Sequence, residues 1–202
     1  MQTFSVTNLP KLELLNVTVE PVTYRDRPAM RLLETDPTSD QECLAILPDS
    51  KFKDGEIETM IAGSPRPDAP ADMRGFVGIA FRVQPQASQF EVFYLRPTNG
   101  RANDQLRRNH STQYSSHPDF PWFKLREENP GVYESYVDLV PGEWTQVKIV
   151  ASGTRAELYV NAAEQPCLIV NDLKLGQTEG NIGLWIGAGS QAYFSDISVS
   201  PE

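Results

Sequence analysis

The sequence is poor in positive charge and in long apolar runs. Its 18 lysine and arginine residues are outnumbered by 27 aspartate and glutamate residues, which gives a net charge of −9. Nucleic acids and anionic membranes select positive protein surfaces, so this balance argues against either as the main partner. No apolar run approaches the length of about 18 residues that a membrane-spanning helix needs. The first residues, MQTFSVTNLPKLELLNV, also lack the basic start and apolar core of a secretory leader.

Cysteine is scarce, and the spacing of the two cysteines matches no metal or redox motif. Cys43 and Cys167 each lie in an apolar, strand-like run, ECLAILP and PCLIV. We interpret them as buried thiols in a reducing compartment, with one disulfide as the alternative. If the chain is full length, this indicates a cytoplasmic protein, and the sequence leaves compartment and oligomeric state otherwise open. We predict neither a metal nor a cofactor.

Helical patterning is almost absent, and 16 prolines interrupt the windows where a helix would need continuity. Period-two runs separated by Gly, Pro, Asn and Asp are frequent instead, and they predict an all-β fold of two packed antiparallel sheets. A chain of 202 residues fits one such sandwich, so we expect a single domain over 1–202. The predicted strands span residues 11–20, 29–34, 42–47, 54–62, 75–84, 89–96, 132–140, 144–151, 155–161, 166–171, 180–187 and 191–199. One short helix or turn is expected near 101–109.

Two connections between these strands are long, 62–74 and 98–131, and long loops in compact domains are usually functional or mobile. The second overlaps the most informative stretch of the chain, Phe90–Trp122, which holds both histidines together with arginines, asparagines and aromatic rings. Aromatic rings cover the apolar face of a sugar, and amides, guanidinium groups and carboxylates satisfy its hydroxyls. This composition predicts a carbohydrate or another polar small ligand. The expected ligand-binding residues are Tyr94, Arg96, Asn99, Arg101, Gln105, Asn109, Tyr114, His117, Trp122 and Trp185.

A catalytic set is the alternative interpretation of the same segment. His110, Glu91 and Asp119 supply a histidine and carboxylates for acid–base chemistry, with Glu58 and Glu134 as further carboxylate candidates. Glu91 shares a strand face with Phe93 and Leu95, so it is either a buried carboxylate with a partner such as Arg82 or a site carboxylate. The spacing of His110, His117 and Asp119 matches no metal motif.

The three tryptophans receive different assignments. Trp144 opens a strand after PGE and is expected to fill the core of the sandwich. Trp122 lies in the long loop, and Trp185 alternates with Ile182, Leu184 and Ile186, so both are expected to face a ligand.

Three stretches together resemble the concanavalin A-like lectin/glucanase superfamily: FKDGEIETMIAG, the pair GFVGIAFRV and FEVFYLRP, and PGEWTQVKIVASGTRAELYVN followed by GNIGLWIGAGSQAYFSDISV. The last is most similar to the laminin-G-like and 3-keto-disaccharide-hydrolase-type branches. The resemblance covers about residues 50–200 and implies a jelly roll that binds its ligand on the concave sheet and its rim loops. The E-x-D-x-x-E strand of laminarinase-type members is absent, so their retaining chemistry is not expected.

Two functions follow from these observations. The first is a carbohydrate-binding domain that recognises a glycan on the concave sheet and the loop 98–131. The second is a hydrolase that processes glycosides with a His/carboxylate pair. The sequence does not decide between a binding protein and an enzyme.

Overall fold

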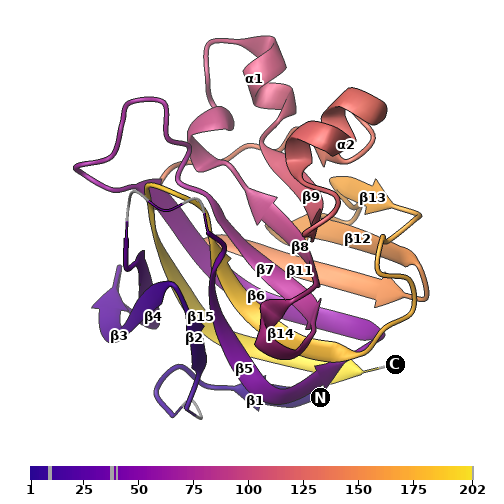
Figure 1. The fold of residues 1–202 in the computed structure, drawn as a ribbon. Coiled ribbons are helices and arrows are strands. Elements are labelled where there is room, and N and C mark those ends of the chain that lie inside the picture. The colour runs from indigo at the N-terminus through magenta and orange to yellow at the C-terminus, as the bar shows by residue number, and fades with distance from the viewer. Residues whose placement is uncertain (9–10, 37–38, 40, 202) are drawn as a thin grey trace.

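The chain folds as a sandwich of two antiparallel β-sheets, which confirms the predicted fold class (Figure 1). The computed structural model describes residues 1–8, 11–36, 39 and 41–201. One sheet has eight strands in the order β13-β12-β11-β6-β15-β4-β3, with β1 paired to β15, and the other has seven in the order β10-β9-β8-β7-β14-β5-β2. That residues 1–202 form a single domain stays a prediction.

The strands of the eight-stranded sheet are β1 (Gln2–Phe4), β3 (Val17–Tyr24), β4 (Arg27–Glu34), β6 (Gly55–Pro65), β11 (Thr145–Ser152), β12 (Arg155–Val160), β13 (Leu168–Val170) and β15 (Ser190–Pro201). Those of the seven-stranded sheet are β2 (Glu13–Leu15), β5 (Cys43–Phe52), β7 (Val77–Val83), β8 (Phe90–Leu95), β9 (Thr112–His117), β10 (Glu134–Ser135) and β14 (Gly180–Ile186). The helical segments are the 3-10 turns η1 (Pro85–Ala87) and η2 (Pro97–Asn99) and the α-helices α1 (Gln105–Asn109) and α2 (Trp122–Glu128).

The core lies between the two sheets and follows from the period-two pattern of the strands. In β11, Val147, Ile149 and Ala151 point inward, while the residues between them are partly exposed on the outer face. Successive side chains of a strand point to opposite faces, so such an alternating strand buries one face only. This is the ordinary state of an antiparallel sheet that covers a core.

The segment 98–131 is not the long loop that the sequence predicts. It contains a complete strand, β9, which pairs with β8 from Phe90↔His117 to Leu95↔Thr112. It also contains α1 near the predicted helix and the unpredicted α2, which lie together at one end of the sandwich beside β8 and β9 (Figure 1). β9 has the sequence TQYSSH, whose polar residues give no apolar alternation. β9 is a strand because it pairs with β8, and its composition alone does not indicate a strand.

Trp144 and the two cysteines differ in how closely they follow the sequence-based expectations. The expectation that Trp144 fills the core is wrong: its ring is half-buried and lies edge-on to Tyr24, with Nε1 donating to the carbonyl of that residue at 3.3 Å. Both cysteines are free thiols, Cys43 buried and Cys167 partly buried. Burial raises the pKa of each thiol to about 12.

Candidate functional site

The outer face of the seven-stranded sheet is unusually apolar. All six residues of β8 are buried, because Glu91, Phe93 and Leu95 face the core while the alternate side chains join a second apolar cluster on the outer face. That cluster consists of Leu44, Ile46, Ala80, Val83, Ala87, Phe90, Val92, Tyr94 and Trp185. A sheet apolar on both faces needs something beyond the core to cover its second face.

A glycine on this face allows two aromatic rings to lie close together. Gly78 of β7 pairs with Trp185 on one side and with Tyr94 on the other, so the three residues form a row across the strands. The rings of Tyr94 and Trp185 meet beside Gly78 with their centroids 4.7 Å apart. A Cβ atom at Gly78 would lie 2.6 Å from Cβ of Tyr94 and 2.4 Å from the carbonyl oxygen of Phe93. The glycine is therefore what allows the close approach.

The side chain of Trp122 is a third aromatic ring near the Tyr94–Trp185 pair. Trp122 is the first residue of α2, immediately after Pro121, and 42% of it is exposed. The guanidinium groups of Arg96 and Arg126 lie 5.5 Å and 4.7 Å from its ring centroid, within the range of cation–π attraction. An exposed tryptophan held in one orientation by its neighbours is suited to stacking against a ligand.

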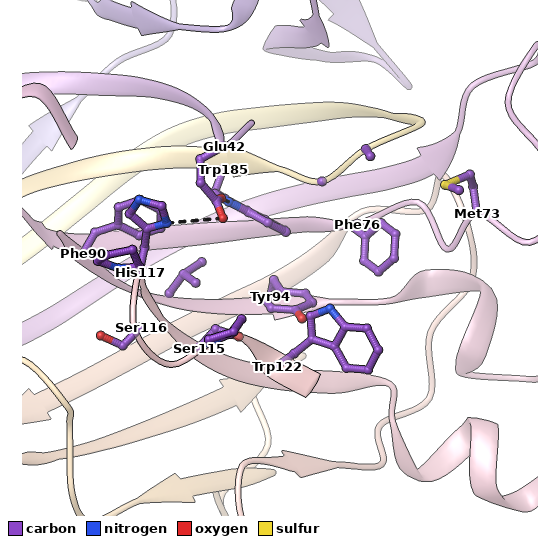
Figure 2. A pocket seen from close by; sticks show the side chains of 15 residues that line it. Glu42, Met73, Phe76, Phe90, Tyr94, Ser115, Ser116, His117, Trp122 and Trp185 are labelled. Atoms are coloured by element: carbon purple, nitrogen blue, oxygen red, sulfur yellow. Dashed lines mark hydrogen bonds and ion pairs between the residues drawn. The ribbon is translucent and has the colours of Figure 1, made fainter. Parts of the chain in front are cut away.

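These three rings line a pocket of about 340 Å³, within the size range of small-molecule sites (Figure 2). Polar groups gather on the side of the pocket opposite Trp122. Nε1 of Trp185 donates to Oε2 of Glu42 at 2.6 Å, and Nδ1 of His117 lies 3.6 Å from Oε1 of the same carboxylate. The imidazole of His117 is stacked on Phe90 at 4.9 Å. The pocket thus combines apolar ring faces with a fixed carboxylate and an imidazole, the combination that a hydroxyl-rich ligand requires.

A more polar cleft of about 600 Å³ adjoins the pocket and shares Met73, Phe76 and Trp122 with it. At its far side, Nε2 of His110 lies 3.2 Å from Oε1 of Glu134. Arg126 donates to both oxygens of that carboxylate, from Nη2 at 2.6 Å and from Nε at 3.1 Å.

Burial lowers the pKa of His110 below its usual value, and the charges of Arg126 and Arg96 act in the same direction, while Glu134 opposes them. Because the pKa is lowered, the imidazole loses its proton at a lower pH than a free histidine. The neutral imidazole of His110 is therefore favoured over a wider pH range than that of a free histidine.

The structure gathers most of the sequence-predicted site residues at this end of the seven-stranded sheet. Four of them line the aromatic pocket: Tyr94, His117, Trp122 and Trp185. Arg96, Asn99 and His110 line the adjoining cleft. Asn109 lines a third hollow, next to His110 and Glu134.

Three predicted residues lie apart from the pocket and the cleft. Arg101 is exposed and forms a bidentate ion pair with Asp138. Gln105 is exposed and donates to Asn109 on the next turn of α1. Asp119 is an exposed residue after β9, and its backbone oxygen accepts from Lys124. The structure therefore does not bring Asp119 to His110.

Two further predictions, a catalytic Glu91 and a ligand-binding Tyr114, are wrong because both side chains face the core. Neither residue has exposed surface. Oη of Tyr114 donates to Oε2 of Glu91 at 2.5 Å and accepts from the backbone N–H of Lys174 at 2.9 Å, and the N–H of Leu175 donates to Oε1 of Glu91 at 2.7 Å. Burial raises the pKa of Glu91 and raises that of Tyr114 well above its usual value. The pair ties β8 and β9 to the segment that precedes β14.

Replacing Tyr114 by phenylalanine should lower the free energy of unfolding by about 1–3 kcal/mol, the usual cost of leaving a buried polar group without its partner. Ligand binding should not change, because the lost hydroxyl points into the core. Urea unfolding and a binding titration measure the two effects. The exposed Tyr136, whose hydroxyl accepts from Arg108, offers Tyr136→Phe as the matched control with little effect on stability. Lost binding with unchanged stability in Tyr114→Phe would restore Tyr114 as a ligand contact.

Sequence reasoning missed several residues of the site. Glu42 and Phe76 lie in other parts of the chain and reach the pocket only through the strand order β8-β7-β14-β5. Arg74 and Arg126 line the cleft from the loop before β7 and from α2. Glu134 was a carboxylate candidate, and the structure makes it the partner of His110. The only sequence signal for Arg126 was its nearness to the Phe90–Trp122 stretch.

Within the described part of the chain, no three His, Cys, Asp or Glu side chains are grouped as metal ligands would be. None of the helices among the described residues has the length and apolar character needed to cross a bilayer.

Comparison with solved structures relates this sandwich to proteins of known fold. The chain is similar to the carbohydrate-binding module CBM66 from Bacillus subtilis, with 14% identity, a TM-score of 0.63 and coverage of 95% of this chain and 98% of that one. It is also similar to a β-glucanase from Bacillus licheniformis (14% identity, TM-score 0.57, coverage 100% and 98%). A third similar structure is the exoplasmic/lumenal domain of VIP36 in a form bound to Ca²⁺ and mannose (11% identity, TM-score 0.57, coverage 97% and 85%). No protein-family model matches the sequence, and a search of curated proteins found no match.

The chain has the concanavalin A-like jelly-roll fold that its sequence motifs predicted. Its placement in the laminin-G-like or 3-keto-disaccharide-hydrolase-type branch stays a prediction.

Proposed function

We propose that this protein is a carbohydrate-binding domain whose ligand lies in the pocket between Trp122 and the Tyr94–Trp185 pair. The observation that carries the proposal is the row Tyr94–Gly78–Trp185, in which a glycine allows two rings to meet on the outer face of a sheet. The rings present apolar surface to the C–H face of a sugar. Glu42 and His117 supply a carboxylate and an imidazole for its hydroxyls.

The structural comparisons support this proposal. The protein from B. subtilis is named a carbohydrate-binding module, the VIP36 domain is in a form bound to Ca²⁺ and mannose, and the third protein is named a β-glucanase. The present chain shares their sandwich over nearly its full length. Its aromatic pocket lies on one sheet and is flanked by α2, the arrangement expected of a ligand site that a rigid scaffold positions.

A glycan array with purified protein tests the proposal directly. We expect retention of a limited set of oligosaccharides, with signals that are lost when free oligosaccharide competes. If no saccharide on a broad array is bound, and Trp122→Ala leaves every measured property unchanged, the proposed function is wrong.

One observation favours hydrolysis of a glycoside as a second candidate. His110 and Glu134 lie 3.2 Å apart at the edge of the cleft, as an acid–base pair would. However, Glu134 accepts three hydrogen bonds from Arg126, and only 4% of its side chain is exposed. These contacts suit a carboxylate that orients the imidazole of His110. They suit a carboxylate that exchanges protons with a substrate less well.

If the protein is an enzyme, His110→Ala should reduce turnover by roughly 100-fold or more, the usual contribution of a general base. Because burial lowers the pKa of His110, the neutral imidazole would persist to a pH below its ordinary value of 6.5. Turnover would fall only when the pH drops through that lowered pKa. Reducing-end release from array-positive oligosaccharides measures this. Absence of release by the unmodified protein, or equal release by His110→Ala, excludes the His110 mechanism and leaves the binding function.

A further inference from the structure

The cleft beside the aromatic pocket is strongly cationic in a chain whose net charge is −9. Its lining contains four arginines from four separate segments: Arg74, Arg96, Arg107 and Arg126. Two carboxylates, Asp72 and Asp104, also line it. Oδ1 of Asp104 accepts from the backbone N–H of Arg107 and so caps α1. The positive charge is therefore concentrated in one place and only partly balanced there.

Arg96 is the most unusual member of this group. It is 5% exposed, and among the described residues its guanidinium donates only to neutral acceptors: the hydroxyl of Tyr94 at 3.1 Å, Oε1 of Gln113 at 3.2 Å and the carbonyl of His110 at 3.2 Å. Burial lowers the pKa of this guanidinium. A buried cation normally has a carboxylate in contact, because desolvation of an unpaired charge is costly. The nearby carboxylate Glu134 is already occupied by Arg126.

Arg107 and Arg74 also lack an ion pair among the residues that the structure describes. Arg107 donates to Oδ1 of Asn99 and to the carbonyl and hydroxyl of Thr98, all neutral. No side-chain hydrogen bond or ion pair of Arg74 is found in the described part of the chain. Burial lowers its pKa, and the charges of Arg107 and Arg96 lower it further, against the opposing charge of Asp72. The charge of Arg74 is thus repelled by those of Arg96 and Arg107, which line the same cleft.

The cleft and the pocket adjoin each other, because Met73, Phe76 and Trp122 line both. The guanidinium of Arg96 lies 5.1 Å from the ring centroid of Tyr94 and 5.5 Å from that of Trp122. A sugar ring stacked on these aromatic side chains would place a substituent on its cleft side within reach of the arginines. Guanidinium groups bind carboxylate and sulfate oxygens through paired, charge-assisted hydrogen bonds.

We propose that the cleft lined by Arg74, Arg96 and Arg107 binds the anionic group of an acidic saccharide, a carboxylate or a sulfate ester, whose ring occupies the aromatic pocket. This inference rests on the proposed function and specifies its ligand class. The anion neutralises the crowded guanidinium groups, which compensates for the cost of holding them together. The protein discriminates against neutral glycans because they leave that charge unbalanced.

The test uses matched oligosaccharide pairs in isothermal titration calorimetry. Trigalacturonic acid is compared with its methyl ester, and a sulfated chondroitin oligosaccharide with its desulfated form. We expect at least one charged probe to bind 10-fold or more tightly than its neutral partner, and raising NaCl to about 0.5 M should remove most of that preference by screening. The pair that shows the preference identifies the anion as carboxylate or sulfate.

Arg74→Gln is the most informative variant, because the side chain of Arg74 has no hydrogen bond to lose in the described structure. We expect it to weaken binding of the preferred charged probe by about 10-fold, to leave the neutral partner unchanged, and to leave the melting temperature unchanged or higher because repulsion is relieved. Arg25→Gln is the control for charge alone, since Arg25 is exposed and pairs with Glu143 beside Trp144.

The outcomes separate this inference from the proposed function. If charged and neutral probes bind equally and both lose binding in Trp122→Ala, the anion subsite is wrong and the carbohydrate site stands. If the acid preference is present but Arg74→Gln and Arg25→Gln reduce it equally, the preference reflects overall charge and the cleft is not its source. If no probe and no glycan of the array binds, both proposals fail.

Discussion

Replacing Trp122 by alanine is expected to weaken saccharide binding by at least 10-fold while leaving the fold intact. The ring closes the aromatic pocket opposite Tyr94 and Trp185, so its removal eliminates one of the surfaces that cover the sugar. A stacked ring contributes on the order of 1 kcal/mol beyond the area that it buries, and the burial itself adds to this. Because 42% of Trp122 is exposed, the loss of stability should be small. Calorimetric titration with an array-positive oligosaccharide, beside a thermal melt, measures both.

Trp144→Ala is the matched control for this experiment. Trp144 is also a partly buried tryptophan, but it packs against Tyr24 and Arg27, and Tyr24 is stacked on Tyr193 of the eight-stranded sheet. Its replacement should reduce stability and leave binding unchanged. Lost binding in Trp144→Ala together with normal binding in Trp122→Ala would place the site on the eight-stranded sheet.

The second large effect is expected for Arg82→Ala, which should lower the free energy of unfolding by about 3–5 kcal/mol. Arg82 has no exposed surface, and its guanidinium joins four groups: the carbonyls of Lys53, Gly153 and Gly176 and the carboxylate of Asp54. These groups belong to three different connections between strands. Removing the side chain takes away the donor of four partly buried hydrogen bonds at once, which costs more than the loss of one hydrogen bond. Urea unfolding followed by tryptophan fluorescence measures the change.

Arg155→Ala is the corresponding control, because Arg155 is half-exposed and pairs with Glu157 near the surface. Exposed ion pairs contribute less than about 1 kcal/mol, so this variant should unfold close to the unmodified protein. A stability loss below 1 kcal/mol in Arg82→Ala, equal to that of the control, would show that the hydrogen bonds of Arg82 do not hold these connections together.

The sequence predicts most strands correctly because burial on one face of an antiparallel sheet imposes a period of two. β11 shows this, since Val147, Ile149 and Ala151 alternate with more polar residues, and β14 and β7 carry dense β-branched and aromatic residues. β9 could not be predicted in this way. Thr112–His117 contains a single large ring, and its place in the sheet depends on hydrogen bonds to β8, which local composition does not encode.

Some residues of the candidate site could likewise be predicted from the sequence, and others could not. Tyr94, Trp122 and Trp185 could be predicted because strand alternation and an exposed tryptophan point to a ligand face. Glu91 and Tyr114 could not be told from site residues, since a buried carboxylate–phenol pair has the same composition as a functional one. Glu42 and Arg74 were missed because each reaches the site through strand order and loop conformation, neither of which has a sequence signature.

The arrangement explains why one stretch of sequence supplies so much of the site. β8 and β9 are neighbours, so residues on their shared outer face converge, and α2 returns Trp122 and Arg126 to the same place. The stretch Phe90–Trp122 therefore consists of β8, η2, α1, β9 and the first residue of α2, in place of the long loop that its polarity suggests.

The position of the bound sugar can be determined from a crystal of the protein soaked with its best-binding oligosaccharide. We expect density for a sugar ring between Trp122 and the Tyr94–Trp185 pair, with hydroxyls near Glu42 and His117 and any anionic substituent directed to Arg96. A sugar bound instead on the outer face of the eight-stranded sheet, in the hollow lined by Glu58, Gln146 and Tyr159, would contradict this expectation.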